Sequence, residues 1–133
     1  MIIGIGIDLL KVNRIKKVLD KYGDTFLNKV FTDSEISNSN RFFLRENKFA
    51  KCFSTKEAFV KALGVGFKEG ISYKDISLKN KESGQPYLGL SNNVKRFLSN
   101  KTPKGYKSQI DVTISDDKDY VISNVVISFI KSK

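Results

Sequence analysis

The sequence predicts an α+β fold in which an antiparallel sheet packs against one long central helix. Three observations support this prediction. The chain closes with a hairpin pattern, because QIDVTIS alternates polar and apolar residues and YVISNVVISFI follows the turn DDKD. The segment 42–64 carries apolar residues at helical spacing. Strands and helices are mixed along the chain instead of alternating as βαβ units, which favours α+β over α/β.

The first half of the chain begins with a strand at about residues 2–8 and continues into a helix. In KVNRIKKVLDKYG, apolar residues recur near helical spacing and Gly23 is a natural helix end. TDSE at 32–35 is a capping box that starts a short helix, and SNSNR after it is predicted to be a loop. The long periodic segment 42–64 follows as the central helix.

The second half alternates loops and short elements before the closing hairpin. GVGFKEG is predicted to be a glycine-rich loop and YKDISLKN a short strand. ESGQPYLGL reads as a tight turn between extended pieces. SNNVKRFLSN is predicted to be a helix with Ser91 as its N-cap.

Length and cysteine usage limit the class of protein. With 133 residues, we expect one domain over 1–133, or two small repeats that share a core, stable without a disulfide or a metal. Cys52 is the only cysteine, so no intrachain disulfide is possible and a reducing cytoplasm is the expected compartment. The first residues are too short and too quickly charged for a membrane span, and they carry no cleavage site.

The charge of the chain indicates an anionic partner. Lys and Arg total 24 against 14 acidic residues, a net charge of +10. Such a surface favours nucleic acid, an anionic membrane, a phosphate-rich ligand or an acidic protein, although lysines spread over solvated faces give the same count. The sequence has no histidine. Any chemistry must therefore use carboxylates, lysines, hydroxyls or a hard metal ion.

The N-terminal GIGID has one face almost bare of side chains. Strand parity places Gly4, Gly6 and Asp8 on one face and isoleucines on the other. A dinucleotide-binding GxGxxG fingerprint is excluded, because Leu9 occupies the third glycine position. The bare face suits close approach of a ligand or of another backbone. The alternative is a packing strand with Asp8 as a helix N-cap.

The central helix carries a possible charged site. Glu57 and Lys61 are four residues apart and share one side of the helix, with Gly64 near the same line. They flank its apolar stripe, so we expect both to be partly buried. That stripe consists of Phe49, Phe53 and Val60. Lys56 falls nearer the apolar centre, where a lysine needs an anion or a route to solvent.

Asp8 and Glu57 together offer two hard oxygen ligands. This set suits Mg²⁺, which takes one or two carboxylates together with phosphate oxygens and waters. Lys61 beside them can neutralise a phosphate, so the residues predict phosphoryl-type transfer. The alternative is that Glu57 and Lys61 form only a weak surface salt bridge.

Several motifs together resemble a known family. GIGIDLLKVNRI, FTDSEI, FSTKEAFVKALGVGF, SGQPYL and the closing hairpin occur in this order. In order and spacing they resemble the holo-(acyl-carrier-protein) synthases, the small bacterial 4′-phosphopantetheinyl transferases. The pair of GIGID and KEAFVKALG is the specific part of the resemblance. It implies a 4′-phosphopantetheinyl transferase-like fold.

The resemblance also implies an activity. Such enzymes transfer 4′-phosphopantetheine from coenzyme A to a serine hydroxyl of apo-acyl carrier protein. They use Mg²⁺, release adenosine 3′,5′-bisphosphate and support fatty acid biosynthesis in the cytoplasm. Family members are commonly homotrimers with clefts between subunits, so a homotrimer is expected here. Neither nucleic acid nor membrane is an expected partner.

The resemblance assigns roles to residues of this sequence. Asp8, Glu57 and Lys61 would be catalytic, with Asp8 and Glu57 as metal ligands and Lys61 facing the pyrophosphate. Glu57 or a metal-held water would take the serine proton. The residues assigned to coenzyme A are Lys56, Lys61, Gly64, Gly66, Pro86 and Ser115.

The carrier protein is expected at the first helix. Arg14 matches a basic position that meets the acidic carrier protein in the family. By charge alone, Lys17, Lys21 and Lys29 extend the same face.

Two positions depart from the family pattern. Cys52 stands where many relatives have Arg, and Asp116 stands where they have His. An aspartate near the 3′-phosphate of the nucleotide would repel it. Lys118 and Lys56 are candidates to compensate. We expect Cys52 to be a small buried residue and not a nucleophile, because no base is at hand.

Two other functions account for part of the sequence. A nucleic-acid-binding module would explain the charge and the phenylalanines, but the chain has no RNP, KH or zinc-knuckle signature. A catalytically inactive family member would explain the two departures. Asp8, Glu57 and Lys61 are all present, which favours the active transferase.

Overall fold

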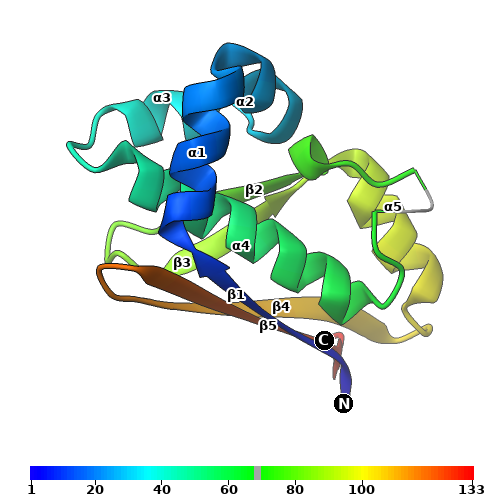
Figure 1. Ribbon diagram of the computed structural model, residues 1–133. Helices are drawn as coiled ribbons and strands as arrows, with labels where there is room; N and C mark the ends of the chain where they lie inside the picture. Colours follow the sequence, from blue (N-terminus) through cyan, green and yellow to red (C-terminus); the bar gives the residue numbers. More distant parts are fainter. Residues whose placement is uncertain (68–69) are drawn as a thin grey trace.

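A computed structural model of the chain describes residues 1–67 and 70–133 (Figure 1). Its elements are β1 (Ile2–Lys11), α1 (Val12–Tyr22), α2 (Asp24–Val30), α3 (Asp33–Asn40), α4 (Arg45–Leu63), the 3₁₀ turn η1 (Tyr73–Asp75), β2 (Ile76–Asn80), β3 (Pro86–Leu90), α5 (Asn92–Lys101), β4 (Tyr106–Asp116) and β5 (Tyr120–Lys131). The mixture of helices and antiparallel strands confirms the predicted α+β class.

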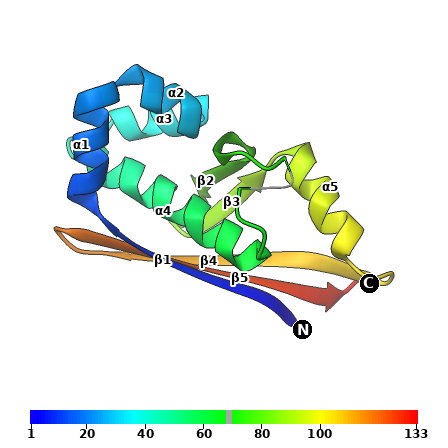
Figure 2. The ribbon, with the colours of Figure 1, turned by 45° about the vertical axis from the view of Figure 1, so that its right-hand side comes forward.

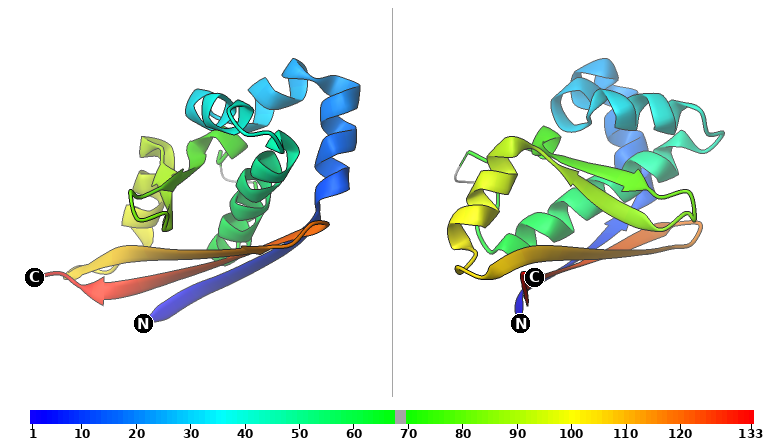
Figure 3. Two further views of the ribbon diagram at one scale, coloured as in Figure 1. Left: turned by 90° about the vertical axis from the view of Figure 1, so that its left-hand side faces the viewer. Right: turned by 180° about the vertical axis from the view of Figure 1, so that it is seen from behind.

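The main sheet has the strand order β1-β5-β4, with both pairings antiparallel. The closing hairpin is therefore confirmed, and β1 adds to its β5 edge with Asp8 opposite Ser123. The helices and the small β2–β3 sheet all lie on one side of this main sheet (Figure 2). Among the described elements none covers the opposite face (Figure 3). The sheet thus has one packed face and one open face.

The central helix α4 lies across the packed face and supplies residues to two hydrophobic clusters. Its N-terminal half contributes Phe49 to a cluster with Phe31 and the buried residues of α1. Its C-terminal half contributes Phe59 to a cluster with Ile76 and Val94. The predicted long helix is confirmed, and it ends at Gly64 in the left-handed conformation, with φ of 80°.

The bare face of β1 is explained by this helix. A side chain at Gly4 would overlap the carbonyl oxygen of Ala62, and one at Gly6 would overlap that of Ala58. The glycines therefore admit the backbone of α4 itself. Of the two groups expected to come close to this face, a ligand or another backbone, it is the backbone of α4 that does so. The isoleucines of the opposite face are exposed, as strand parity predicts.

Several local predictions are confirmed. The Thr32 hydroxyl accepts from the Glu35 amide and the Glu35 carboxylate accepts from the Thr32 amide, which completes the capping box of α3. Ser91 caps α5 by accepting from the amide of Val94. The SGQP segment turns between β2 and β3.

Other local predictions are wrong. Most of SNSNR is helical, because α3 continues to Asn40. The N-cap of α1 is Lys11, without a side-chain hydrogen bond, so Asp8 is not a helix cap. The predicted loop over 64–70 includes residues 68 and 69, which lie outside the described residues. In the described ranges, no helix has both the length and the apolar character needed to cross a membrane.

Candidate active site

The crossing of β1 over α4 brings Asp8 beside Lys61. The Ser54 hydroxyl of α4 donates to the carbonyl oxygen of Asp8 at 3.1 Å. About two turns further along the helix, Lys61 Nζ donates to the carbonyl oxygen of Ile7 at 3.0 Å. The same ammonium pairs with Asp8 Oδ1 at 3.3 Å. The Lys61 side chain is 54% exposed and the Asp8 side chain 15%. Strand and helix therefore meet at an acid and a solvent-accessible lysine.

Glu57 lies on α4 between Ser54 and Lys61 and is half-buried, as expected. Its Oε1 accepts a hydrogen bond of 2.8 Å from the hydroxyl of Tyr73. Within the described ranges, the ammonium of Lys61 pairs with Asp8 instead of with Glu57, so the weak helix salt bridge is not formed. The ion pair between Lys61 and Asp8 of β1, two residues far apart in the sequence, forms in place of it.

Tyr73 belongs to this site, although no sequence pattern marks it. YKDISLKN is predicted to be one short strand, but YKD forms the 3₁₀ turn η1 and the strand begins only at Ile76. The ring of Tyr73 is stacked on Phe53, with centroids 5.5 Å apart, and packs against Phe67 at 3.8 Å. Burial raises the pKa of Tyr73, and the charges of Glu57 and Asp8 raise it further. The phenol therefore stays protonated at neutral pH and acts as a hydrogen-bond donor. Both carboxylates lie close enough to influence the same hydroxyl.

The two carboxylates fit a hard divalent cation. The Tyr73 hydroxyl donates a hydrogen bond to only one carboxylate oxygen of Glu57, so the other oxygen is available to a cation. The carboxylate of Asp8, on the facing strand β1, offers further oxygen ligands. Within 1–67 and 70–133, no group of three or more His, Cys, Asp or Glu side chains is placed to hold a metal. The remaining positions of an ion would therefore be filled by substrate phosphate and water, which is the pattern that Mg²⁺ prefers.

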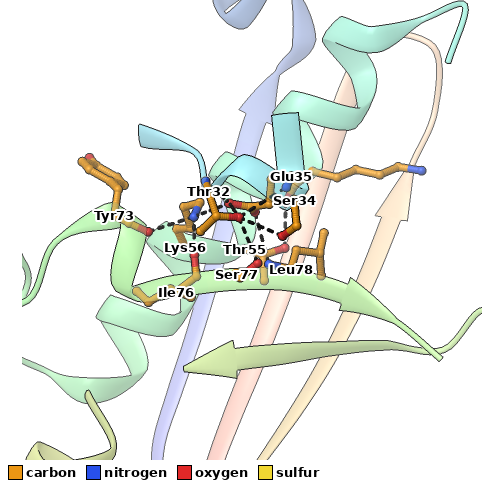
Figure 4. Close-up of polar contacts among 10 residues, drawn as sticks. Thr32, Ser34, Glu35, Thr55, Lys56, Tyr73, Ile76, Ser77 and Leu78 are labelled. Carbon is orange, nitrogen blue, oxygen red and sulfur yellow. Dashed lines mark hydrogen bonds and ion pairs between the residues drawn. The ribbon is translucent and has the colours of Figure 1, made fainter. Parts of the chain in front are cut away.

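Lys56, which was expected to contact coenzyme A, is instead an interior cation (Figure 4). Its ammonium pairs with Glu35 at 2.7 Å, and both side chains have no exposed surface. It also donates to the carbonyl oxygens of Tyr73 and Ile76. The anion that the sequence required for Lys56 is thus Glu35 of α3, and Lys56 is enclosed away from any ligand. The assignment to coenzyme A, and the idea that Lys56 compensates at the nucleotide, are wrong.

Pro86 lies in a pocket against another side of α4. The pocket is bounded by α3, α4, the β2–β3 turn and β4, and it contains two lysines, Lys48 and Lys51. Lys51 pairs with Asp116 at 3.4 Å. The acid that stands in place of the family's histidine is therefore neutralised by the residue that precedes Cys52. Lys118 lies in a separate pocket, between the α3–α4 connection and the β4–β5 turn.

Cys52 is buried at the edge of this pocket, as expected. Burial raises the pKa of its thiol, and the neighbouring Glu35 raises it further. The thiol is therefore protonated and unreactive at neutral pH.

The residues assigned to coenzyme A lie in three places in one chain. Lys61, Gly64 and Gly66 lie at and just beyond the C-terminal end of α4. Pro86 lies in the lysine-containing pocket. Ser115 is exposed near the end of β4, opposite Ile122 of β5. A single chain does not bring these three groups together.

The residues assigned to the carrier protein are all exposed. Arg14, Lys17 and Lys21 lie on α1, whose other side is buried through Ile15 and Leu19. Lys29 lies on the next helix, α2. The helix that begins directly after the strand of Asp8 therefore presents a basic surface to solvent.

Comparisons with known proteins identify the family of this chain. The profile described as the 4′-phosphopantetheinyl transferase superfamily matches residues 4–125. The holo-(acyl-carrier-protein) synthase of Sphingopyxis alaskensis is 42% identical over 132 residues, covering 98% of this chain and 99% of the relative. The Wolbachia pipientis protein of the same name is 45% identical over 130 residues, covering 96% and 98%.

Solved structures show the same fold. The holo-(acyl-carrier-protein) synthase of Neisseria meningitidis superposes with a TM-score of 0.87 at 29% identity, over 96% of this chain and 99% of that one. The Helicobacter pylori enzyme, solved in complex with coenzyme A, superposes with a TM-score of 0.79 at 28% identity, over 93% and 99%. This chain therefore belongs to the 4′-phosphopantetheinyl transferase superfamily, among its holo-(acyl-carrier-protein) synthases.

Proposed function

We propose that residues 1–133 form one transferase domain that moves 4′-phosphopantetheine from coenzyme A to a serine hydroxyl of apo-acyl carrier protein with the help of Mg²⁺. The observation that carries this proposal is the crossing of β1 over α4, which places Asp8 and Lys61 in contact beside Glu57. Two acids and a solvent-exposed ammonium at one place suit the binding and reaction of a pyrophosphate. The names of the relatives describe the same transfer.

Asp8 and Glu57 would hold the cation. When bound, Mg²⁺ supplies charge neutralisation at the pyrophosphate oxygens. The hydrogen bond from Tyr73 leaves one carboxylate oxygen of Glu57 for this purpose. Asp8 gives its oxygens from the facing strand, where it now meets Lys61.

Lys61 and Glu57 would act on the reacting groups. The serine oxygen forms a bond to the phosphorus that bears pantetheine, and the bridging pyrophosphate bond breaks to release adenosine 3′,5′-bisphosphate. Lys61, with more than half of its side chain exposed, can turn from Asp8 to the phosphate and stabilise the charge that develops there. The second oxygen of Glu57 is available to accept the serine proton.

We propose that the nucleotide end of coenzyme A binds in the pocket of Lys48, Lys51 and Pro86. The two lysines supply the positive charge that a phosphate group requires, and Lys51 already offsets Asp116. At about 100° per residue, Lys48 and Lys51 lie about 120° or more from Glu57 around the axis of α4. One coenzyme molecule therefore reaches both places most simply if they belong to two copies of the chain.

The open face of the main sheet supports a homotrimer with clefts between subunits. On this face, β1 exposes four large apolar side chains of alternate residues, and β5 adds Ile122. A contiguous apolar face of this kind is typical of a protein–protein interface. The four β1 residues are Ile3, Ile5, Ile7 and Leu9. Packing of these faces would also bring Ser115, next to Ile122 in the β4–β5 pairing, to a subunit boundary.

The basic surface of α1 is proposed to bind the carrier protein. Arg14, Lys17 and Lys21 are exposed on the helix that directly follows the strand of Asp8, and Lys29 follows on α2. An acidic partner bound there would be held by charge complementarity close to the reacting groups. We further propose that the reaction takes place in the cytoplasm and serves fatty acid biosynthesis.

Mass spectrometry of apo-acyl carrier protein tests the proposal. The protein is incubated with the carrier and coenzyme A, with Mg²⁺ in one arm and excess chelator in the other. We expect the carrier to gain the mass of 4′-phosphopantetheine only in the Mg²⁺ arm. An unmodified carrier under conditions where a known transferase works would overturn the proposed function.

A further inference from the structure

The hydroxyl of Tyr73 makes a contact that the core does not need. The ring is held between Phe53 and Phe67, and a phenylalanine at this position would keep both contacts. Only the hydroxyl reaches Glu57, at 2.8 Å from Oε1. Because Glu57 is the helix-borne acid of the proposed cation site, this hydrogen bond fixes which of its oxygens remains free.

The backbone that carries Tyr73 is fixed from two sides. Its carbonyl oxygen accepts from the buried ammonium of Lys56 at 2.8 Å. On the other side of η1, the Asp75 carboxylate accepts from the Ser72 amide at 2.8 Å and from the Ser91 hydroxyl at 2.7 Å. Burial of Asp75 acts to raise the pKa of its carboxyl, but these hydrogen bonds outweigh burial and hold the pKa below its usual range. The Tyr73 hydroxyl is thus delivered to Glu57 from an anchored turn.

The fixed hydroxyl also restricts the motion of Glu57. A half-buried glutamate on a helix has several rotamers, and ordering one of them before a cation arrives removes part of the entropic cost of binding. Partners of this kind, which hold a ligating carboxylate in place, affect metal affinity by about 10- to 100-fold.

We propose that Tyr73 is a positioning residue that orients the Glu57 carboxylate for the divalent cation through its hydroxyl group. The inference rests on the proposed function, because it takes Glu57 as a metal ligand. It assigns to Tyr73 no contact with coenzyme A or with the carrier protein.

Binding of Mn²⁺ to the full chain, followed by electron paramagnetic resonance, tests this role directly. Tyr73→Phe is compared with the unchanged protein and with Tyr106→Phe, which removes a hydroxyl at the start of β4. We expect Tyr73→Phe to weaken Mn²⁺ binding about tenfold and Tyr106→Phe to leave it unchanged. In the transfer assay, the Mg²⁺ concentration for half-maximal rate should rise about tenfold in Tyr73→Phe. The rate at saturating Mg²⁺ should stay within about threefold of the original.

Two further variants separate the possible failures. Phe53→Leu loosens the same ring stack while the hydroxyl is kept, so it should lower the melting temperature without the tenfold loss of Mn²⁺ affinity. If Phe53→Leu and Tyr73→Phe lower Mn²⁺ affinity equally, Tyr73 acts only through packing and the inference fails. If Glu57→Gln loses Mn²⁺ binding while Tyr73→Phe binds as the unchanged protein does, the inference fails and the proposed function stands. If Glu57→Gln binds Mn²⁺ normally, the proposed metal site and this inference fail together.

Discussion

Gly6 determines how closely the strand of Asp8 lies on the central helix. Its missing side chain lets β1 touch the backbone of α4 at Ala58, and Gly4 does the same at Ala62. Two residues further along the strand, Asp8 is held by Ser54 and Lys61. The glycines therefore contribute to the site by setting the distance between its two acids.

Gly6→Ala should lower the free energy of unfolding by at least about 2 kcal/mol, because the new methyl group meets backbone atoms that cannot turn aside. Gly89→Ala is the matched control in another strand. There the new methyl group would come within 2.9 Å of the end of the Lys79 side chain, which can move, so the change should stay below about 0.5 kcal/mol. Urea unfolding measures both, and equal midpoints for the two variants would contradict the packing explanation.

Single residues also show what the sequence was able to predict. Strand parity placed Gly4, Gly6 and Asp8 on one face, but it did not distinguish a ligand from a helix backbone as the group that comes close. The helical pattern predicted that Lys56 is buried, but it did not indicate which acidic residue pairs with it. Glu35 already had a local role in the capping box of α3, and only the tertiary packing shows that its carboxylate also reaches Lys56 and the amide of Leu78.

Among the elements, α1 and α4 were predictable from the sequence, and the last turn of α3 was not. A segment of 19 residues with apolar periodicity and a glycine at its end carries its own signal. The SNSN part of α3 has residues that favour caps and turns. It is helical because the capping box starts the helix and because Ser39 packs in the interior. Tyr73 was missed because a 3₁₀ turn of three residues has no periodicity to detect.

The basic helix α1 carries the proposed contact with the carrier protein. Arg14→Glu reverses a charge on its exposed side, so we expect the KM for the carrier protein to rise at least about tenfold while the KM for coenzyme A changes less than twofold. Arg96→Glu on α5 changes the net charge by the same amount and is also exposed. Steady-state kinetics of both variants test the contact. Equal effects of Arg14→Glu on the two substrates, or an equal loss in Arg96→Glu, would place the carrier elsewhere.

At the scale of the whole molecule, the proposed metal site and the proposed nucleotide pocket lie on different sides of α4. Asp8 and Glu57 lie where β1 crosses α4, and Lys48 and Lys51 line the pocket on another side. The open apolar face of the main sheet supplies a surface through which copies can associate (Figure 3). No pattern within one chain encodes such a pairing, since in the proposed homotrimer its two halves would belong to different molecules.

Two variants that are each inactive alone should together recover transfer activity in a mixed oligomer. Glu57→Gln removes the metal site and Lys51→Glu the nucleotide pocket, so each should lose at least about 100-fold in transfer rate. Co-expressed at equal levels in one oligomer, they should regain about a quarter of the original rate, because that share of the clefts receives an intact half from each chain. The transfer assay on the purified mixed oligomer measures the recovery. A mixed oligomer no more active than its parents would mean that each chain binds coenzyme A alone.

The most direct measurement of the central claim is transfer by Glu57→Gln, followed by the mass of the carrier protein. Glu46→Gln, in the first turn of the same helix, is the matched control. The account predicts that Glu46→Gln modifies the carrier at the original rate, while Glu57→Gln slows modification at least about 100-fold with an unchanged melting temperature. A Glu57→Gln protein that loads 4′-phosphopantetheine onto the carrier at the original rate would remove Glu57 from the site and contradict the account.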